Sequence, residues 1–193
     1  GYKDWDFDTR YSFVSKSGKE FALNLQEIMS LYAYSKREQA DLHLSMGGFV
    51  FEDSTVVIKK KGVPVEYKIN VADAHNISFE VLQEITRRLT DEQKAFVDEM
   101  QSYMSNELSA KGNEVSIALY DIDLFREKNY FPLKSAKQYM FEKNEAAGEV
   151  RLKNSGFTKK TVRNANNPIV LRGFMDVWAG HVNDMAMYHA FVL

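Results

Sequence analysis

The 193-residue sequence contains no cysteine, which excludes disulfide bonds, thiolate catalysis and cysteine-based zinc sites. No apolar run reaches the roughly 18 residues that a membrane-spanning helix requires, so we expect no membrane partner. The sequence also lacks glycine-rich phosphate loops and the motifs that carry serine nucleophiles. Only four histidines are available as nitrogen ligands or as bases near neutral pH. We therefore expect no cofactor, no metal site and no catalytic residue.

Charge is distributed unevenly along the sequence. Residues 126–172 hold eleven Lys and Arg against four Glu, a local charge of +7. Because the whole chain carries −2, the remaining residues sum to −9. A cationic stretch beside an anionic body indicates an acidic partner surface, either nucleic acid or another part of a larger protein. Pairing of the stretch with the chain's own acidic residues is a third possibility.

Within this stretch, basic side chains are interleaved with asparagines, and both residue types contact phosphate in nucleic-acid complexes. Nearby aromatic residues, including Tyr130, Phe131 and Tyr139, either stack on exposed bases or belong to the core. The candidate nucleic-acid-binding residues are Arg151, Lys153, Lys159, Lys160, Arg163 and Arg172.

Capping signals and apolar periodicity predict several helices. Asn24 and Glu27 have capping-box spacing and begin a helix over 24–44, and Ser78 begins a short one over 79–89. Thr90 and Gln93 form a second capping box, which begins a helix over 91–110. Gly112 is a possible interruption before the pattern resumes at 115–120. Further helices are expected at 136–146 and 172–193, separated by a polar, mobile loop over 148–168.

Two hairpins are expected between these helices. Residues 11–15 and 19–23 alternate around a Ser17-Gly18 turn, and a second, extended region over 49–70 turns at Lys59–Gly62. Pro64 has no N–H, so it places its strand at a sheet edge. The lysine-rich tip either contacts phosphate or simply keeps the edge soluble. These patterns predict an α+β fold, dominated by helices, with two small hairpins packed on a helical core.

The composition shifts near residue 126. We therefore divide the chain into residues 1–125, a hairpin-plus-helix core, and residues 126–193, a basic irregular segment with a C-terminal helix. We expect both parts to pack on one core as a single domain. The chain begins without Met and ends inside an apolar helical pattern, so we expect it to be a piece of a longer polypeptide.

The last helix carries an apolar stripe with a spacing near 3.5 residues, which is typical of a helix that contacts another helix. We expect this face to contact neighbouring domains of a parent polypeptide or to drive self-association. The candidate interface residues are Phe174, Val177, Trp178, His181, Met185, Tyr188 and Val192.

Carboxylates and histidines provide few candidates for a catalytic or metal site. His181 and Asp184 lie one helical turn apart and are the pair on which a scattered hydrolase or nuclease site would depend. The position of His181 within the apolar stripe favours a structural role. Asp121 and Asp123 flank Ile122 but have no third ligand at a convincing spacing for a divalent ion, so we interpret them as a solvated turn.

Several segments resemble the very large polyvalent proteins of phages and integrative elements. They are Leu31–Ala40, His43–Gly48, Leu89–Lys94, Gly112–Val115 and Glu127–Leu133, within a similarity that spans roughly residues 20–190. Such proteins join many domains, some enzymatic, and are thought to be delivered with phage DNA or to protect it. The resemblance assigns no catalytic residue to this chain, and it implies a location in the host cytoplasm or in the virion.

These observations favour a non-catalytic structural or interaction module of a phage or mobile-element protein. Two alternatives remain open. One is a sequence-nonspecific domain that binds DNA or RNA through residues 126–172, and the other is an uncharacterised hydrolase or nuclease.

Overall fold

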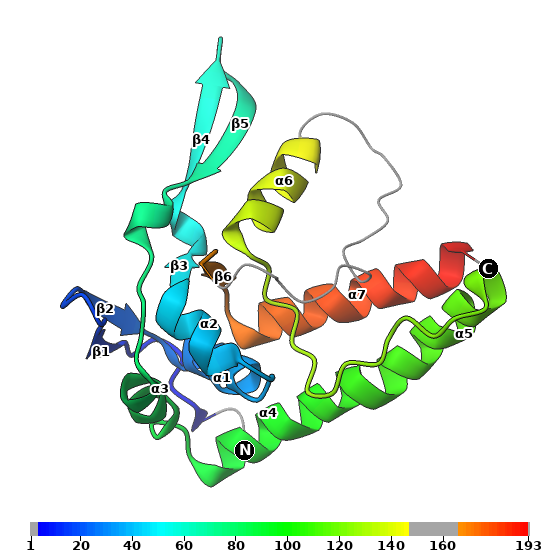
Figure 1. Cartoon of the computed structure of the whole chain (residues 1–193), viewed down its shortest axis with the longest axis horizontal. Helices are drawn as coiled ribbons and strands as arrows, with labels where there is room; N and C mark the ends of the chain where they lie inside the picture. Colours follow the sequence, from blue (N-terminus) through cyan, green and yellow to red (C-terminus); the bar gives the residue numbers. More distant parts are fainter. Residues whose placement is uncertain (1–3, 147–165, 193) are drawn as a thin grey trace.

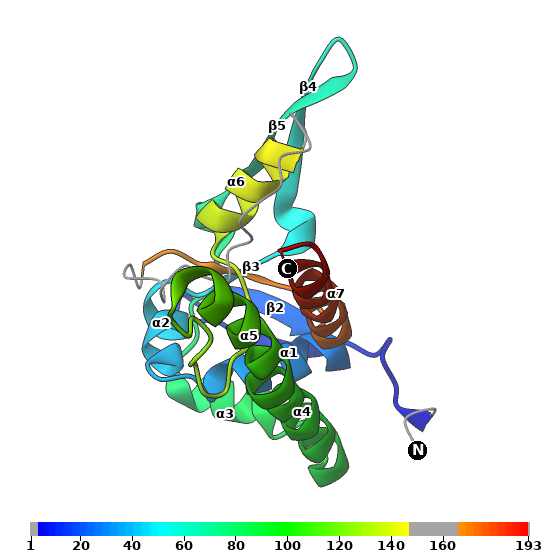
Figure 2. The same ribbon diagram turned by 90° about the vertical axis from the view of Figure 1, so that its right-hand side faces the viewer.

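The computed structural model describes residues 4–146 and 166–192. It confirms a helix-dominated α+β fold with two antiparallel hairpins, β1 (Tyr11–Val14) with β2 (Glu20–Leu23) and β4 (Thr55–Lys60) with β5 (Val63–Ile69). Figures 1 and 2 show a helical body from which the β4–β5 hairpin projects. No helix among the described residues has both the length and the apolar character needed to cross a membrane.

The first helical region differs from its prediction. Asn24 and Glu27 form the expected capping box and begin α1 (Leu25–Ser35), but the helix ends there and α2 (Ala40–Met46) follows as a separate element. The prediction of one helix over 24–44 was therefore wrong. The break contains neither Gly nor Pro, and Gln39 adopts a left-handed φ of 61°. Tertiary contacts stabilise it, because Arg37 within the break ion-pairs with Glu127 from a distant segment.

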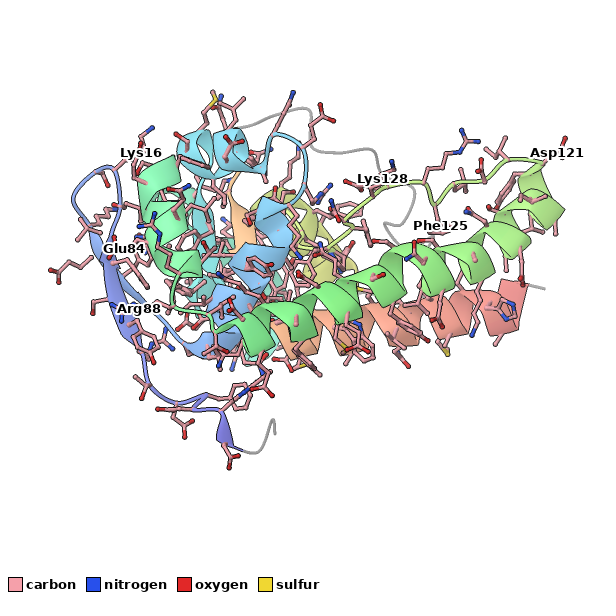
Figure 3. The ribbon with its side chains drawn as sticks, turned by 90° about the horizontal axis from the view of Figure 1, so that it is seen from below. Lys16, Glu84, Arg88, Asp121, Phe125 and Lys128 are labelled. Atoms are coloured by element: carbon pink, nitrogen blue, oxygen red, sulfur yellow. The ribbon has the colours of Figure 1, made fainter. Side chains whose placement is uncertain are left out.

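The second helical region is longer than expected. Ser78 caps α3 (Phe79–Thr86), and Thr90 and Gln93 form the predicted capping box at the start of α4 (Asp91–Tyr103). A π-helical turn, Met104–Leu108, then leads without interruption into α5 (Ser109–Tyr120). Gly112 lies inside α5 rather than ending it. Figure 3 shows the chain after α5 turning back along the same helix, from Asp121 through Phe125 to Lys128.

The remaining elements come from the C-terminal part of the chain and complete the core. The chain forms α6 (Ala136–Ala146), then β6 (Ile169–Leu171) after the undescribed residues, and finally α7 (Phe174–Val192). β6 pairs in parallel with β3 (Phe49–Phe51), and this sheet was not predicted from the sequence. The mobile loop that we predicted over 148–168 falls almost entirely outside the described residues.

One apolar cluster joins the N-terminal and C-terminal parts of the chain. Phe131 and Phe174 are fully buried and stack with ring centroids 5.4 Å apart. They belong to the same cluster as Ile28 of α1, Phe49 of β3 and Ile169 of β6. The basic segment is therefore anchored to the body by Phe131 and Tyr139, which are both buried.

Candidate interaction surfaces

Most of the candidate nucleic-acid-binding residues cannot be placed. Arg151, Lys153, Lys159, Lys160 and Arg163 lie outside the described residues. Arg172 is described, and its Nε lies 3.3 Å from Glu52 Oε2 in an ion pair with the body.

Glu52 connects Arg172 to α6. The Tyr139 hydroxyl donates to Glu52 Oε1 at 2.6 Å. Partial burial alone would raise the pKa of Glu52, but the hydrogen bond from Tyr139 and the Arg172 charge outweigh burial and lower it. Burial and the adjacent carboxylate raise the pKa of Tyr139. Arg172 therefore takes part in a contact that fastens β6 and α6 to the turn after β3.

Other described basic residues of the stretch also pair within the chain. Arg126 pairs with Asp123, and Lys134 pairs with Glu142. Lys128 and Lys137 remain exposed. In the described part, the intramolecular pairing that the sequence left open accounts for several of the basic side chains.

The candidate interface on α7 faces the chain's own core. Phe174, Val177, His181 and Met185 are all buried. The Trp178 indole N–H donates to the Met100 carbonyl at 3.3 Å.

The aromatic residue nearer the end of this face is also in contact with the chain. Tyr188 meets the Phe125 ring edge-on, with centroids 6.1 Å apart. Val192 lies in the last turn of α7, where side chains are not described. The described stripe is therefore covered by α4, α5 and the segment that follows α5, because those elements supply the apolar surface that we had assigned to a partner.

His181 lies beside a small cavity of about 50 Å³. Its lining residues are Ser109, Leu124, Phe125, Arg126, Glu127, Tyr130, His181 and Met185. Burial lowers the pKa of His181 to about 4, so the ring is neutral at pH 7. The Tyr130 ring is 5.1 Å from it, centroid to centroid, and burial raises the pKa of Tyr130 to about 12.

Two carboxylates near this cavity bear on the hydrolase alternative. Asp184 does not line the cavity, and burial raises the pKa of its carboxyl. Glu127 does line it, but Glu127 Oε1 accepts from Arg37 Nε at 2.9 Å and from Arg37 Nη2 at 2.6 Å. Among the described residues, no group of three or more His, Asp or Glu is arranged to hold a metal ion. The arrangement resembles a structural ion pair beside a buried, neutral histidine.

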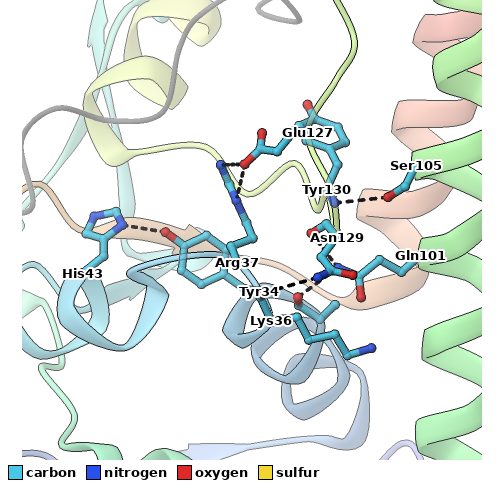
Figure 4. Close-up of polar contacts among 10 residues, drawn as sticks. Tyr34, Lys36, Arg37, His43, Gln101, Ser105, Glu127, Asn129 and Tyr130 are labelled. Carbon is cyan, nitrogen blue, oxygen red and sulfur yellow. Dashed lines mark hydrogen bonds and ion pairs between the residues drawn. The ribbon is translucent and has the colours of Figure 1, made fainter.

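A polar network on the other side of Arg37 explains the position of His43 (Figure 4). The Tyr34 hydroxyl is 2.5 Å from His43 Nδ1, and His43 Nε2 is 2.5 Å from the Asn167 carbonyl. Because a carbonyl oxygen only accepts, Nε2 carries a proton and donates to the Asn167 carbonyl. The hydrogen bond from His43 therefore joins α2 to the residues that precede β6.

The same network fixes the segment after α5. Gln101 Nε2 donates to the Ala33 carbonyl at 3.0 Å and to the Asn129 carbonyl at 2.8 Å. The Tyr130 amide donates to Ser105 Oγ at 3.2 Å. These contacts hold the start of the basic stretch against α1 and the π-helical turn. No local sequence signal predicts these contacts, since their partners are 25 to 68 residues apart.

In the described part of the chain, two further exposed surfaces lie outside the candidate binding and interface residues named from the sequence. The first is the end of α5 and the turn after it, which we call the α5 end. Its four large apolar residues are between 44% and 57% exposed, and they are Ile117, Leu119, Tyr120 and Ile122. The sequence signal for this surface is the loss of one-sided periodicity after residue 116, where apolar residues fall on more than one side of the helix.

The second surface is the β4–β5 hairpin. Val56 and Val63 are 59% and 62% exposed, and the turn carries Lys59, Lys60 and Lys61. Lys61 and Gly62 have φ of 51° and 79°, the positive values that a two-residue hairpin turn requires. The turn predicted at Lys59–Gly62 is therefore confirmed. The hairpin presents both cationic and apolar side chains away from the body.

Comparison of the chain with protein-family models, with curated proteins and with solved structures finds no match. Function must therefore be argued from the chain's own surfaces.

Proposed function

We propose that the chain is a non-catalytic structural and interaction module of a larger phage or mobile-element protein. The observation that carries this proposal is the α5 end, where four large apolar side chains within six residues are about half exposed. Several exposed large apolar side chains this close together are typical of a contact site. The resemblance to polyvalent phage proteins supports a parent polypeptide as its context, in the host cytoplasm or in the virion.

A neighbouring domain that covers the α5 end would remove its apolar side chains from water, and this burial would stabilise the contact between the two domains. Full burial of a large apolar side chain contributes roughly 1.5–3 kcal/mol, so completing the burial of a half-exposed one adds about 1 kcal/mol. Four such residues give about 4 kcal/mol before the cost of association, enough for docking between domains that are already joined covalently.

The test compares backbone hydrogen exchange in the isolated chain with exchange in the intact parent protein. We expect residues 116–122 to exchange more slowly in the parent, because a neighbouring domain covers them. The exposed face of α3, around Glu84, is the control and should exchange equally in both. In the parent, Ile117→Lys combined with Tyr120→Lys should restore fast exchange. Equal exchange at 116–122 in both forms would contradict the proposal.

A second candidate function, sequence-nonspecific binding of nucleic acid, is favoured by the lysines at the tip of the projecting hairpin. Residues 55–70 hold four Lys and one Glu, a net charge of +3 on an exposed arm. Such binding weakens steeply between about 50 and 200 mM salt. Replacing Lys59, Lys60 and Lys61 by Glu should abolish retention on immobilised DNA at low salt. If the unmodified chain elutes from DNA at low salt, this candidate is rejected.

A further inference from the structure

The β4–β5 hairpin is held at its base, and its turn extends away from the helical body. At the base, the Tyr67 amide donates to Asn144 Oδ1 of α6 at 2.6 Å, and Asn144 Nδ2 donates back to the Tyr67 carbonyl at 3.3 Å. Ile69, at the end of β5, is buried in one apolar cluster with Tyr139 of α6. In Figures 1 and 2 the turn between β4 and β5 lies beyond the end of α6. The hairpin is therefore an arm that α6 braces only near its base.

The positive charge at the turn is not neutralised by the described part of the chain. Lys59, Lys60 and Lys61 are exposed, and none of them has an ion-pair partner among the described residues. Lys68 differs from them, because its Nζ lies 3.7 Å from Glu66 Oε1. Three like charges on successive residues repel one another, and a partner with closely spaced negative charges would relieve this repulsion. The turn is therefore complementary in charge to a polyanion.

The side chains of the arm favour a double-stranded nucleic acid over a single strand. Proteins that bind single strands without sequence preference stack the bases on exposed aromatic side chains. Tyr67 is the only aromatic residue within residues 55–70, and it is partly buried. The exposed apolar side chains of the arm include Val56 and Val63, which are aliphatic. Such side chains contact sugars and thymine methyl groups but provide no surface on which a base can stack.

The dimensions of the arm fit the major groove of B-form DNA. A two-stranded ribbon with its side chains is about 10 Å thick, as the spacing of packed sheets shows. The major groove is about 12 Å wide and admits such a ribbon, whereas the minor groove is about 6 Å wide. Val57 lies opposite Tyr67, and the three steps from Val57 to Lys60 span about 10 Å, which exceeds the groove depth of about 8.5 Å. In double-stranded RNA the major groove is too narrow for the arm.

We propose that the turn of the β4–β5 hairpin enters the major groove of duplex DNA, where Lys59, Lys60 and Lys61 contact phosphates on the groove walls. Phosphate contacts carry no sequence information, so the binding is nonspecific. Three such contacts give weak binding, with a dissociation constant on the order of 10 μM near physiological salt. This inference rests on the second candidate function and names its ligand. It does not depend on the α5 end.

Fluorescence anisotropy with three labelled probes tests the choice of ligand. The probes are a DNA duplex of about 20 base pairs with an A·T-rich centre, one of its single strands, and the RNA duplex of the same sequence. The DNA duplex should bind the chain about tenfold more tightly than the other two. Raising the salt from about 50 to 200 mM should weaken this binding about 40-fold, because three phosphate contacts give a slope of about −2.7 in log K against log salt. Equal binding to all three probes overturns the inference alone, whereas binding to none also rejects the second candidate function.

A pair of double variants tests whether the hairpin makes the contacts. Lys59→Gln combined with Lys60→Gln should reduce the salt slope to about −0.9, because each lost phosphate contact removes about one unit. Lys111→Gln combined with Lys128→Gln is the matched control, since it removes the same charge from two exposed lysines of the helical body. The control should keep the slope of the unmodified chain. Equal loss in both double variants would mean that total charge binds the DNA, and it overturns the inference.

Blocking each groove in turn tests where the hairpin lies. A DNA duplex whose pyrimidines carry a bulky substituent at C5 has its major groove filled, because C5 faces that groove. The chain should bind this duplex about tenfold more weakly than the unmodified one. Netropsin, which occupies the minor groove, should not displace the chain. Unchanged affinity for the substituted duplex, or displacement by netropsin, would place the hairpin outside the major groove and overturns the inference.

Discussion

Two glycines inside helices have opposite surroundings, and the same substitution should therefore have opposite effects. A Cβ at Gly112 of α5 would lie 2.5 Å from Met185 Cε and 2.9 Å from two ring carbons of Phe125. A Cβ at Gly180 of α7 would meet nothing within 4 Å. We predict that Gly180→Ala stabilises the protein and that Gly112→Ala destabilises it.

The magnitudes follow from two competing terms. In a helix interior, alanine is favoured over glycine by about 1 kcal/mol, and this gain applies at both positions. At Gly180 nothing opposes it. At Gly112 the added methyl must displace the Phe125 ring as well as the flexible end of Met185, and overpacking of a core costs typically 1–3 kcal/mol. The net loss at Gly112 is therefore up to about 2 kcal/mol, and the two variants should differ by about 1–3 kcal/mol.

Urea denaturation measures both free energies of unfolding, and thermal unfolding gives a second reading. For a chain of this size, 1 kcal/mol shifts the midpoint temperature by about 2–4 °C. Combining Gly112→Ala with Met185→Leu should recover part of the loss, because the side-chain end that meets the methyl is removed. Equal stabilisation by both alanine variants would refute the close packing of α5 against α7 and Phe125.

Two further predictions concern buried polar groups. Burial lowers the pKa of His181 to about 4, below its unfolded value near 6.5, so the unfolded state binds the extra proton between these pH values. Protonation of His181 therefore does not affect the free energy of unfolding above about pH 6.5. As the pH falls below that value, the free energy of unfolding decreases, by about 2 kcal/mol between pH 7 and pH 5. His181→Leu should flatten this dependence in urea titrations, and an unchanged slope would show that the imidazole is solvated. Asn144→Leu should lower the local stability around the Tyr67 amide by about 1 kcal/mol, so this amide should exchange with solvent faster. Asn144→Asp should have an intermediate effect. Unchanged exchange in the Leu variant would mean that α6 does not pair with β5.

Local signals in the sequence predicted much of the fold. Asn24 with Glu27 and Thr90 with Gln93 form the two capping boxes that were expected, and both hairpins turn where Gly18 and Gly62 place them. These features depend on residues within four positions of each other, so short-range hydrogen bonds and backbone preferences suffice to specify them.

Long-range features could not be predicted in this way. The parallel pairing of Phe49 with Ile169 joins strands that are far apart in the chain, and neither strand contains a pattern that predicts its pairing partner. The break before α2 was missed because it depends on the contact between Arg37 and Glu127 rather than on a helix-breaking residue.

For the candidate interaction surfaces, the order of residues specifies which faces are apolar, whereas the packing of distant elements specifies which of these faces are covered. The stripe on α7 had the spacing of a partner interface, yet Phe174 and Met185 are buried against the chain itself. Tyr120 and Val56 remain exposed, although each has an apolar residue beside it in the sequence. The hydrophobic effect is non-directional, so periodicity identifies a face that must be buried without identifying what buries it.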